Sequence, residues 1–176
     1  MHLSRVNDFA FKIATANGTG SASANGLIMQ AIFRMGVPVT GKNVFPSNIQ
    51  GLPTWYEIRV NKHGYTARTP YFDMVLALNA ATYAKDVAEV RSGGCLLYDS
   101  SWPLDDKLMR PDVTYLGIPL AEMCNEAFKG VRERILMKNI AYAGALAALL
   151  GIDTDTIKGL LKEKFGKKPA LMDSNQ

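Results

Sequence analysis

The segment of this sequence best suited to binding a ligand is a glycine-rich turn, TANGTGSASANG, at residues 15–26. It follows residues 9–14, whose alternating side chains predict a strand, and it runs into a helical pattern that extends to Met35. Glycines allow backbone N–H groups to approach a ligand closely, and the N-terminus of a helix carries partial positive charge. A strand, a glycine turn and a helix in this order predict a cradle for a phosphate-bearing ligand.

The same turn differs from the fingerprint of a dinucleotide-binding site. Gly18 and Gly20 occupy the first two glycine positions, but the third position holds Ser23. The fingerprint also requires an acidic residue about 20 residues further on, which binds a ribose hydroxyl. No Asp or Glu occurs between Phe9 and Tyr56. The segment therefore favours a phosphate over NAD, and a turn that serves packing alone remains the alternative.

Two further segments carry polar side chains that a ligand could reach. The loop FPSNIQGLPTW at residues 45–55 is long and precedes a strand with an outward-facing Arg59, and long ordered loops are often functional. Asn139 lies among apolar residues of a predicted helix, where a partly buried carboxamide needs a partner. That partner is either a ligand or a neighbouring loop. Asn79 and Asp99 each follow a predicted buried strand, where they could line a crevice or cap the next segment.

Conventional catalytic groups are scarce in this chain. It has two histidines, His2 at the terminus and His63 in a predicted exposed turn, which is too few for a metal site of the usual ligand spacing. Cys95 and Cys124 are far apart in sequence and are predicted to be buried thiols in a reducing compartment. Neither a nucleophile with its base nor a carboxylate pair can be recognised. The sequence argues against catalysis by this chain alone.

Length and composition indicate one globular domain. The chain has 176 residues, of which 48% are hydrophobic and 20% charged, and its net charge is +4. Lysines cluster near the end, at Lys158, Lys162, Lys164, Lys167 and Lys168. No aromatic residues are interleaved with them, which favours a solvated helix face over a nucleic-acid site. The longest apolar run, residues 140–150, is too short to span a bilayer, and the N-terminus lacks an apolar signal core. We expect a cytoplasmic protein that binds neither nucleic acid nor membrane.

Strand and helix patterns alternate along the chain. The predicted strands are residues 9–14, 37–39, 55–60, 65–69, 74–78, 95–98 and 113–118. The predicted helices are residues 24–35, 80–90, 120–127, 131–150 and 153–165. The turn signal at residues 61–64 would join two of these strands in a hairpin. The pattern predicts a layered α/β fold with a largely parallel sheet flanked by helices and an inserted β-hairpin.

Three blocks of the sequence together resemble the gamma domain of 2-oxoacid:ferredoxin oxidoreductases. They are GTGSASANG at residues 18–26, GKNVFPSNIQGLPTWYEIRV at 41–60 and MKNIAY at 137–142. The second block is most similar to the amino-terminal gamma domain of 2-oxoglutarate-type alpha subunits. The resemblance implies a single gamma-type domain over residues 1–168. Residues 169–176 resemble the linker that continues into a thiamine-binding module in fused relatives, so the chain is a separate subunit or a fragment.

The resemblance implies a part in the oxidative decarboxylation of a 2-oxoacid, with 2-oxoglutarate favoured, to an acyl-coenzyme A, with electrons passed to ferredoxin. Thiamine diphosphate and iron–sulfur clusters would belong to alpha-type and beta-type partners, and the gamma domain would bind coenzyme A and support assembly. The implied coenzyme A residues are Gly18, Thr19, Gly20, Ser21, Ser47, Asn48, Gln50 and Asn139.

One departure from the family pattern concerns the loop. Related domains that prefer pyruvate often carry lysines where this sequence has Asn48 and Ile49, so its phosphate contacts would be weaker or supplied by a neighbour. Two other functions stay open. One is a free-standing nucleotide-binding protein or small dehydrogenase, and the other is a purely structural subunit.

Overall fold

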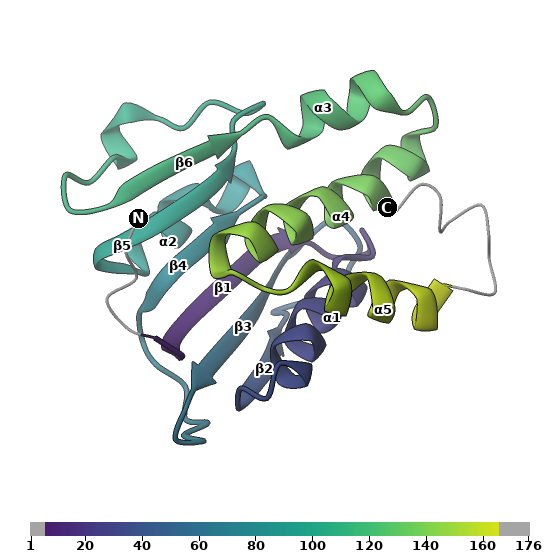
Figure 1. The fold of residues 1–176 in the computed structure, drawn as a ribbon. Coiled ribbons are helices and arrows are strands. Elements are labelled where there is room, and N and C mark those ends of the chain that lie inside the picture. Colours follow the sequence, from purple (N-terminus) through teal and green to yellow (C-terminus); the bar gives the residue numbers. More distant parts are fainter. Residues whose placement is uncertain (1–5, 166–176) are drawn as a thin grey trace.

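The computed structural model describes residues 6–165, and within that range six strands form one sheet in the order β2-β3-β1-β4-β5-β6 (Figure 1). The strands are β1 (Asp8–Ala16), β2 (Val39–Val44), β3 (Pro53–Asn61), β4 (Phe72–Ala77), β5 (Val90–Asp99) and β6 (Thr114–Ile118). The α-helices are α1 (Ser21–Arg34), α2 (Tyr83–Ala88), α3 (Leu120–Ala127), α4 (Val131–Leu150) and α5 (Thr154–Phe165). Short 3₁₀ helices span Ala80–Thr82 and Asp106–Leu108.

The sheet is mixed, with parallel strands in the majority. β1, β4, β5 and β6 pair in parallel, whereas β3 is antiparallel to both β1 and β2. β2 therefore runs in the same direction as β1, and among the strands of residues 6–165 β3 alone is reversed. The predicted layered α/β fold with a largely parallel sheet is confirmed.

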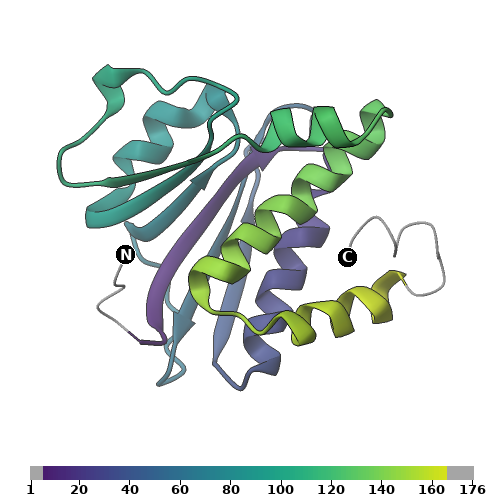
Figure 2. The same cartoon turned by 45° about the horizontal axis from the view of Figure 1, so that its top comes forward.

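Helices cover both faces of the sheet, but unequally. α1, α4 and α5 lie on one face, and α2 lies on the other (Figures 1 and 2). Alternate residues of β1 serve the two layers, because successive side chains of a strand point to opposite faces. Phe11 and Ile13 pack in the core beneath α1 and α4, while Ala10 belongs to the smaller core beneath α2. Burial on both sides explains why residues 74–77 of β4 and 95–97 of β5 are continuous apolar runs.

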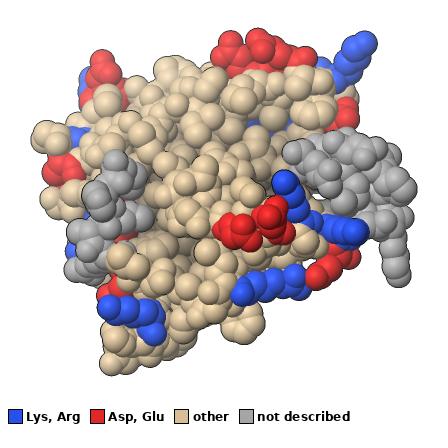
Figure 3. Space-filling model, viewed as in Figure 1, with Lys and Arg blue, Asp and Glu red and all other residues tan. Residues whose placement is uncertain are grey.

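The face that carries α4 and α5 is unevenly charged (Figure 3). Residues 139–150 of α4 contain no charged side chain. Charged side chains gather instead along α5 and the neighbouring end of α1, where Arg34 contacts Glu163 through bonds of 2.8 and 2.6 Å. This bidentate pair links the two helices at the surface.

The predicted hairpin between residues 55–60 and 65–69 is wrong. β3 covers the first segment, but its antiparallel partners are β1 and β2, and residues 65–69 form no strand. The turn signal itself is real, because Asn61 Oδ1 accepts hydrogen bonds from the N–H groups of His63 (2.9 Å) and Tyr65 (3.2 Å). These bonds end β3 and direct the chain across the sheet towards β4.

Two further boundaries differ from the sequence-based expectation. The strand predicted at residues 37–39 lies further along the chain, since β2 spans Val39–Val44. Gly93 and Gly94, predicted to separate a helix from a strand, lie inside β5, which begins at Val90. A Cβ at Gly94 would lie 2.8 Å from the carbonyl oxygen of Asp73, so close backbone approach explains this glycine. The predicted linker at 169–176, His2, and Lys167 and Lys168 lie outside the described residues.

Candidate functional site

The glycine turn joins β1 to α1 at the carboxyl edge of the sheet, beside the end of β4. The connections that follow these two neighbouring strands leave in opposite directions, because α1 lies on one face of the sheet and α2 on the other (Figure 2). In open α/β sheets, ligands bind in the crevice at such a switch point. The fold therefore places the predicted cradle where this architecture forms ligand sites.

The conformation of the turn requires glycine at two positions. Gly18 and Gly20 both have φ of +82°, in the left-handed region that side chains disfavour. A Cβ at Gly18 would also lie 2.7 Å from Cγ of Gln50. Gly20 is the N-cap of α1 and offers no side-chain acceptor, and the first turn of α1 contains no acidic residue. The first N–H groups of a helix have no intrahelical partner, so this end of α1 suits an anion.

Hydrogen bonds hold the turn in place from three directions. Asn139 Nδ2 on α4 donates to the carbonyl oxygen of Thr19 at 2.8 Å. Thr19 Oγ1 donates to the carbonyl oxygen of Ala16 at 2.8 Å, and the hydroxyls of Thr15 and Ser21 lie 2.9 Å apart. The turn is therefore fixed by β1, by the start of α1 and by α4 together.

Asn17 connects the turn to the loop at residues 45–52. Its Nδ2 donates to the carbonyl oxygens of Ser47 (3.4 Å) and Ile49 (3.3 Å), and its backbone bonds to Leu52 and Gly51. Sequence analysis did not select Asn17, although an asparagine in a glycine-rich turn is a recognised signal for such local bonds. Because of Asn17, the two segments predicted to contact coenzyme A lie against each other.

A cleft of about 330 Å³ opens next to the turn. Its walls come from the ends of β1 and β4, the loop after β5, and α4. The lining residues are Thr15, Ala16, Thr19, Leu78, Asn79, Ala80, Trp102, Ile135, Lys138, Asn139 and Tyr142. The wall combines apolar side chains with a few polar groups, which is typical of small-molecule sites.

Two of the eight residues predicted to bind coenzyme A line this cleft, and the other six belong to the turn and to the loop beside it. Thr19 and Asn139 line the cleft, and Asn139 is almost fully buried. Gly18 and Gly20 are exposed in the turn, and Ser21 is buried at the start of α1. In the adjoining loop Gln50 is exposed, and the Ser47 hydroxyl accepts from the N–H of Ile49 at 3.2 Å. The structure gathers all these segments, with Asn48 among them, at one edge of the sheet, and their contacts with a ligand stay predictions.

The sequence left open whether Asn79 and Asp99 line a crevice or cap the next segment, and their hydrogen bonds decide this. Asn79 both lines the cleft and caps the 3₁₀ helix, since its Oδ1 accepts from the N–H of Ala81 at 3.1 Å. Asp99 is fully buried, and its Oδ1 accepts from the N–H groups of Ser101 and Ala121. Sequence analysis missed its neighbour Lys138, whose Nζ lies 3.5 Å from Asp99 Oδ2.

Burial governs the ionisation of several groups near the site. Burial raises the pKa of the Cys95 thiol to about 11, and it raises the pKa of Cys124 as well. Both cysteines are buried and unpaired by a disulfide, as predicted. The pKa of the Tyr142 hydroxyl is also raised by burial, and that hydroxyl donates to Asn25 Oδ1 at 2.9 Å. These groups are therefore neutral at physiological pH and serve packing.

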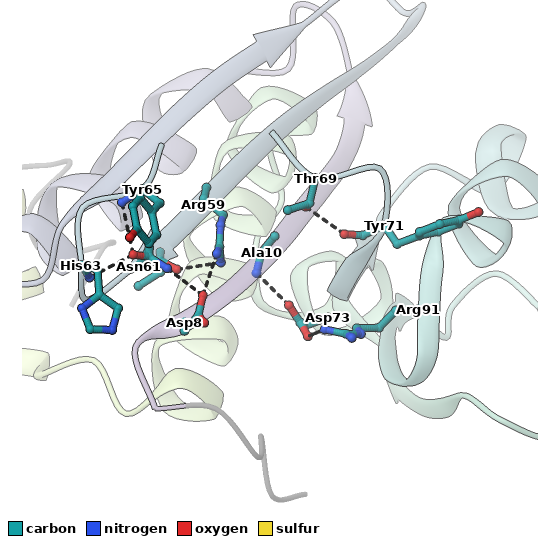
Figure 4. A network of polar contacts seen from close by, with 11 residues as sticks. Asp8, Ala10, Arg59, Asn61, His63, Tyr65, Thr69, Tyr71, Asp73 and Arg91 are labelled. Atoms are coloured by element: carbon teal, nitrogen blue, oxygen red, sulfur yellow. Dashed lines mark hydrogen bonds and ion pairs between the residues drawn. The ribbon is translucent and has the colours of Figure 1, made fainter. Parts of the chain in front are cut away.

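Arg59 does not join this site. It lies at the other end of the strands, near the start of β1. There its Nη2 donates to Asp8 Oδ1 at 2.6 Å, and Asn61 donates to the same oxygen (Figure 4). Nearby, Arg91 pairs with Asp73 at 2.8 Å. Arg59 is far from the loop at residues 45–52, because β3 crosses the sheet between them.

Other kinds of site are not evident within residues 6–165. No group of three His, Cys, Asp or Glu side chains in this part of the chain could hold a metal ion. Among the helices described, none is long and apolar enough to cross a membrane. His63 is exposed, as predicted.

The sequence and the fold of this chain are both similar to those of known oxidoreductases. The sequence profile of the family described as pyruvate ferredoxin/flavodoxin oxidoreductase matches residues 10–176. The alpha subunit of 2-oxoacid:ferredoxin oxidoreductase 2 from Aeropyrum pernix K1 is 33% identical over 92 residues, which are 52% of this chain and 14% of that subunit. The 2-oxoglutarate:ferredoxin oxidoreductase of Magnetococcus marinus, solved with 2-oxoglutarate, coenzyme A and succinyl-CoA bound, is similar with a TM-score of 0.85 at 26% identity.

The lengths of these relatives differ widely. This chain covers 14% of the Aeropyrum subunit and 29% of the Magnetococcus chain, and 97% of its own length aligns with the latter. A pyruvate oxidoreductase subunit of Thermotoga maritima aligns over 97% of this chain and 92% of its own, with a TM-score of 0.73 at 18% identity. The gamma subunit of a keto/oxoacid ferredoxin oxidoreductase from Geobacter sulfurreducens aligns over 95% and 91%, with a TM-score of 0.74 at 20% identity. The last two share the fold, and the profile match shows that this chain belongs to the pyruvate ferredoxin/flavodoxin oxidoreductase family.

Proposed function

We propose that this chain is the gamma-type module of a 2-oxoacid:ferredoxin oxidoreductase, with 2-oxoglutarate as the favoured 2-oxoacid. Its own task is to bind coenzyme A and to support assembly of the complex, while decarboxylation proceeds on partner modules. Residues 1–168 form the module and residues 169–176 a linker or tail. The proposed location is the cytoplasm.

One observation carries the proposal: two glycines with φ of +82° open α1 at the switch point of the sheet. Coenzyme A carries a diphosphate and a ribose phosphate, and anions of this kind suit backbone N–H groups at a helix start. The described residues that line the cleft include no acidic side chain to repel them. The Magnetococcus relative, which was solved with coenzyme A bound, supports the choice of ligand.

Two relatives are named as subunits, alpha in Aeropyrum pernix and gamma in Geobacter sulfurreducens, which supports an assembly with partners. We infer alpha-type and beta-type subunits or domains that carry thiamine diphosphate and iron–sulfur clusters, with ferredoxin as electron acceptor. Thiamine diphosphate supplies the decarboxylation and the clusters carry the electrons. The part of this chain that the structure describes contributes the glycine turn, the loop beside it and the cleft.

A charge placed at the start of α1 tests the coenzyme A site. Ala22 is exposed in the first turn of α1. Ala22→Asp should preserve or raise stability, because a carboxylate at a helix N-terminus is favourable, yet it should repel a phosphate. We expect coenzyme A affinity, measured by calorimetry on the full chain and the assembled complex, to fall at least tenfold. Ala22→Asn, the uncharged control, should retain most of the affinity, whereas equal binding by all three proteins would contradict the site.

Assembly is tested separately by native mass spectrometry of the protein purified anaerobically from its source. The expected result is a complex with larger subunits that carry thiamine diphosphate and iron–sulfur clusters. A chain that is recovered alone and intact would contradict the gamma-module role.

A purely structural role for the turn is the second candidate, and one contact favours it. The Nδ2 group of Asn139 is already bonded to the carbonyl oxygen of Thr19, so this carboxamide has a partner without any ligand. In that case Ala22→Asp would leave coenzyme A affinity of the complex unchanged.

A further inference from the structure

Asp99 is a fully buried carboxylate at the end of β5, next to the cleft. Its Oδ1 accepts hydrogen bonds from the N–H groups of Ser101 (3.2 Å) and Ala121 (3.3 Å). Its Oδ2 is buried and has no hydrogen-bond partner among the described residues. A buried carboxylate is unfavourable unless a cation or donors compensate it. The position therefore demands a counter-ion on the side of Oδ2.

Lys138 on α4 supplies this counter-ion and also reaches the cleft. Its Nζ lies 3.5 Å from Asp99 Oδ2, its side chain is 28% exposed, and it is one of the lining residues. An ammonium group carries three N–H donors, so an ion pair with one carboxylate oxygen leaves donors that can bind a ligand. Lys138 is therefore positioned by its ion pair with Asp99 and remains accessible from the cleft.

The other described residues that line the cleft are uncharged, which gives the charge of Lys138 a larger effect on a bound ligand. Among the described residues that line the cleft, Lys138 is the one with a basic or acidic side chain. Much of the wall is apolar, including Leu78, Trp102 and Ile135. Charge interactions at such a surface are screened less than in bulk water. An anionic group that enters the cleft would meet a single cation in a defined place.

Lys138 is also fixed relative to the glycine turn. The next residue on α4, Asn139, donates a hydrogen bond from its Nδ2 to the carbonyl oxygen of Thr19. The same part of α4 therefore positions both the ammonium of Lys138 and the glycine turn. The helix start at Ser21 and the ammonium of Lys138 are two separate sites for negative charge beside one cleft. A ligand with more than one phosphate group fits this arrangement.

We propose that Lys138 binds a phosphate group of the ligand in the cleft and that buried Asp99 is the counter-ion that holds it there. The identity of the ligand as coenzyme A rests on the proposed function, but the phosphate chemistry of Lys138 does not. Lys138 then supplies a positive charge to the cleft of this module.

Inorganic pyrophosphate is the ligand for the first test, with Trp102 as reporter. Trp102 is 52% exposed and lines the cleft, whereas the other tryptophan, Trp55, is buried. A ligand in the cleft should therefore change the emission of Trp102 and its quenching by acrylamide. Coenzyme A and phosphate-free pantetheine are titrated in parallel by calorimetry, all on the full chain.

The variants separate binding from folding. Lys138→Met alone leaves Asp99 without its counter-ion and is expected to destabilise the fold. The double variant Asp99→Asn/Lys138→Met removes both charges and should regain stability, because a hydrogen-bonded asparagine is neutral. Lys138→Arg retains the charge and the pair, and Lys62→Met removes an exposed lysine at the opposite edge of the sheet as a matched control.

We expect the double variant to bind pyrophosphate and coenzyme A at least tenfold more weakly than wild type, with Lys138→Arg within threefold and Lys62→Met unchanged. Pantetheine should bind wild type and the double variant equally. Equal pyrophosphate affinity in wild type and the double variant would overturn the proposal. If the wild-type chain bound pyrophosphate but not coenzyme A, the proposed function would be contradicted, whereas the phosphate site at Lys138 would still be supported.

Discussion

The carboxamide of Asn139 donates a 2.8 Å hydrogen bond to the carbonyl oxygen of Thr19, 120 residues earlier in the chain. This bond ties the long helix α4 to the glycine turn that begins α1. The asparagine is almost fully buried, whereas its partner Thr19 is half-buried in the turn. The shape of the predicted ligand cradle therefore depends on a residue near the other end of the domain.

Removal of this bond should affect both stability and ligand binding. Asn139→Ala is predicted to lower the free energy of unfolding by about 1 kcal/mol, which is the usual net contribution of one intramolecular hydrogen bond. Coenzyme A affinity should fall as well, since the turn loses its contact with α4. Urea unfolding and calorimetry measure the two effects. Asn125→Ala changes an exposed asparagine and should alter stability by less than about 0.5 kcal/mol.

Two glycines near the start of α1 should respond in opposite directions to alanine. Gly20→Ala places a Cβ at φ +82° and 3.1 Å from Cδ2 of Leu136, and we expect a loss of about 1–3 kcal/mol. Gly26 lies within α1, and a Cβ there would meet no neighbouring element within 4 Å. Gly26→Ala should stabilise the protein by about 0.5–1 kcal/mol through helix propensity. Similar changes in the urea midpoint for both variants would contradict this account of the turn.

A buried lysine beneath α2 should be a major contributor to stability. Lys12 is 2% exposed, pairs with Glu89, and has its Nζ 3.7 Å from Asp86 Oδ1 and 5.1 Å from the ring centre of Trp55. Lys12→Met should cost about 3–5 kcal/mol, because Asp86 would remain buried without its cation.

The control is Lys12→Met/Asp86→Asn. An asparagine can still accept from Trp55 Nε1, which now donates to Asp86 Oδ1 at 2.9 Å. This double variant should therefore recover much of the loss. If it proved no more stable than Lys12→Met in urea, the uncompensated charge would not be the cause.

Stability should decline in alkaline solution through Tyr83. Burial foremost, and then the charge of Asp99, raises the pKa of Tyr83 to about 12, whereas the group titrates near 10 when unfolded. The native state thus retains a proton that the unfolded state releases, and the contribution to stability is complete below about pH 10 and is lost as the pH rises towards 12.

Tyr83→Phe should therefore reduce the decline of the unfolding free energy between about pH 10 and 12, measured in urea. It should not abolish the decline, because the pKa of Tyr142 and of Cys95 is raised for the same reason. An unchanged slope in Tyr83→Phe would show that this hydroxyl does not titrate differently in the two states.

The parts of the fold that were predicted correctly are those encoded within a few residues. The first strand, the glycine turn, the body of α1 from residue 24 and the long helix α4 all follow from local periodicity and from glycine. The helix predicted at residues 131–150 matches α4, which Gly151 ends with φ of +64°. Asp153 Oδ2 accepts from the N–H of Thr156 at the start of α5. In each case the signal and the structure lie in the same turn of the chain.

The errors occurred where a partner is distant. The Asn61 turn was recognised, but the sequence could not reveal that β3 pairs with β1 and β2 instead of with the next segment. Strand pairing depends on which edges the rest of the sheet leaves available, and the pattern of one segment does not contain that information.

The amino-acid sequence by itself determined the layered α/β class, the glycine turn and the lack of an evident catalytic set. The tertiary structure alone decided that Lys138 faces Asp99, that Asn17 joins the turn to the neighbouring loop, and that Lys12 is buried. The physical reason is that local backbone conformation follows from neighbouring residues, whereas the partners and the burial of a side chain depend on packing among elements far apart in the chain.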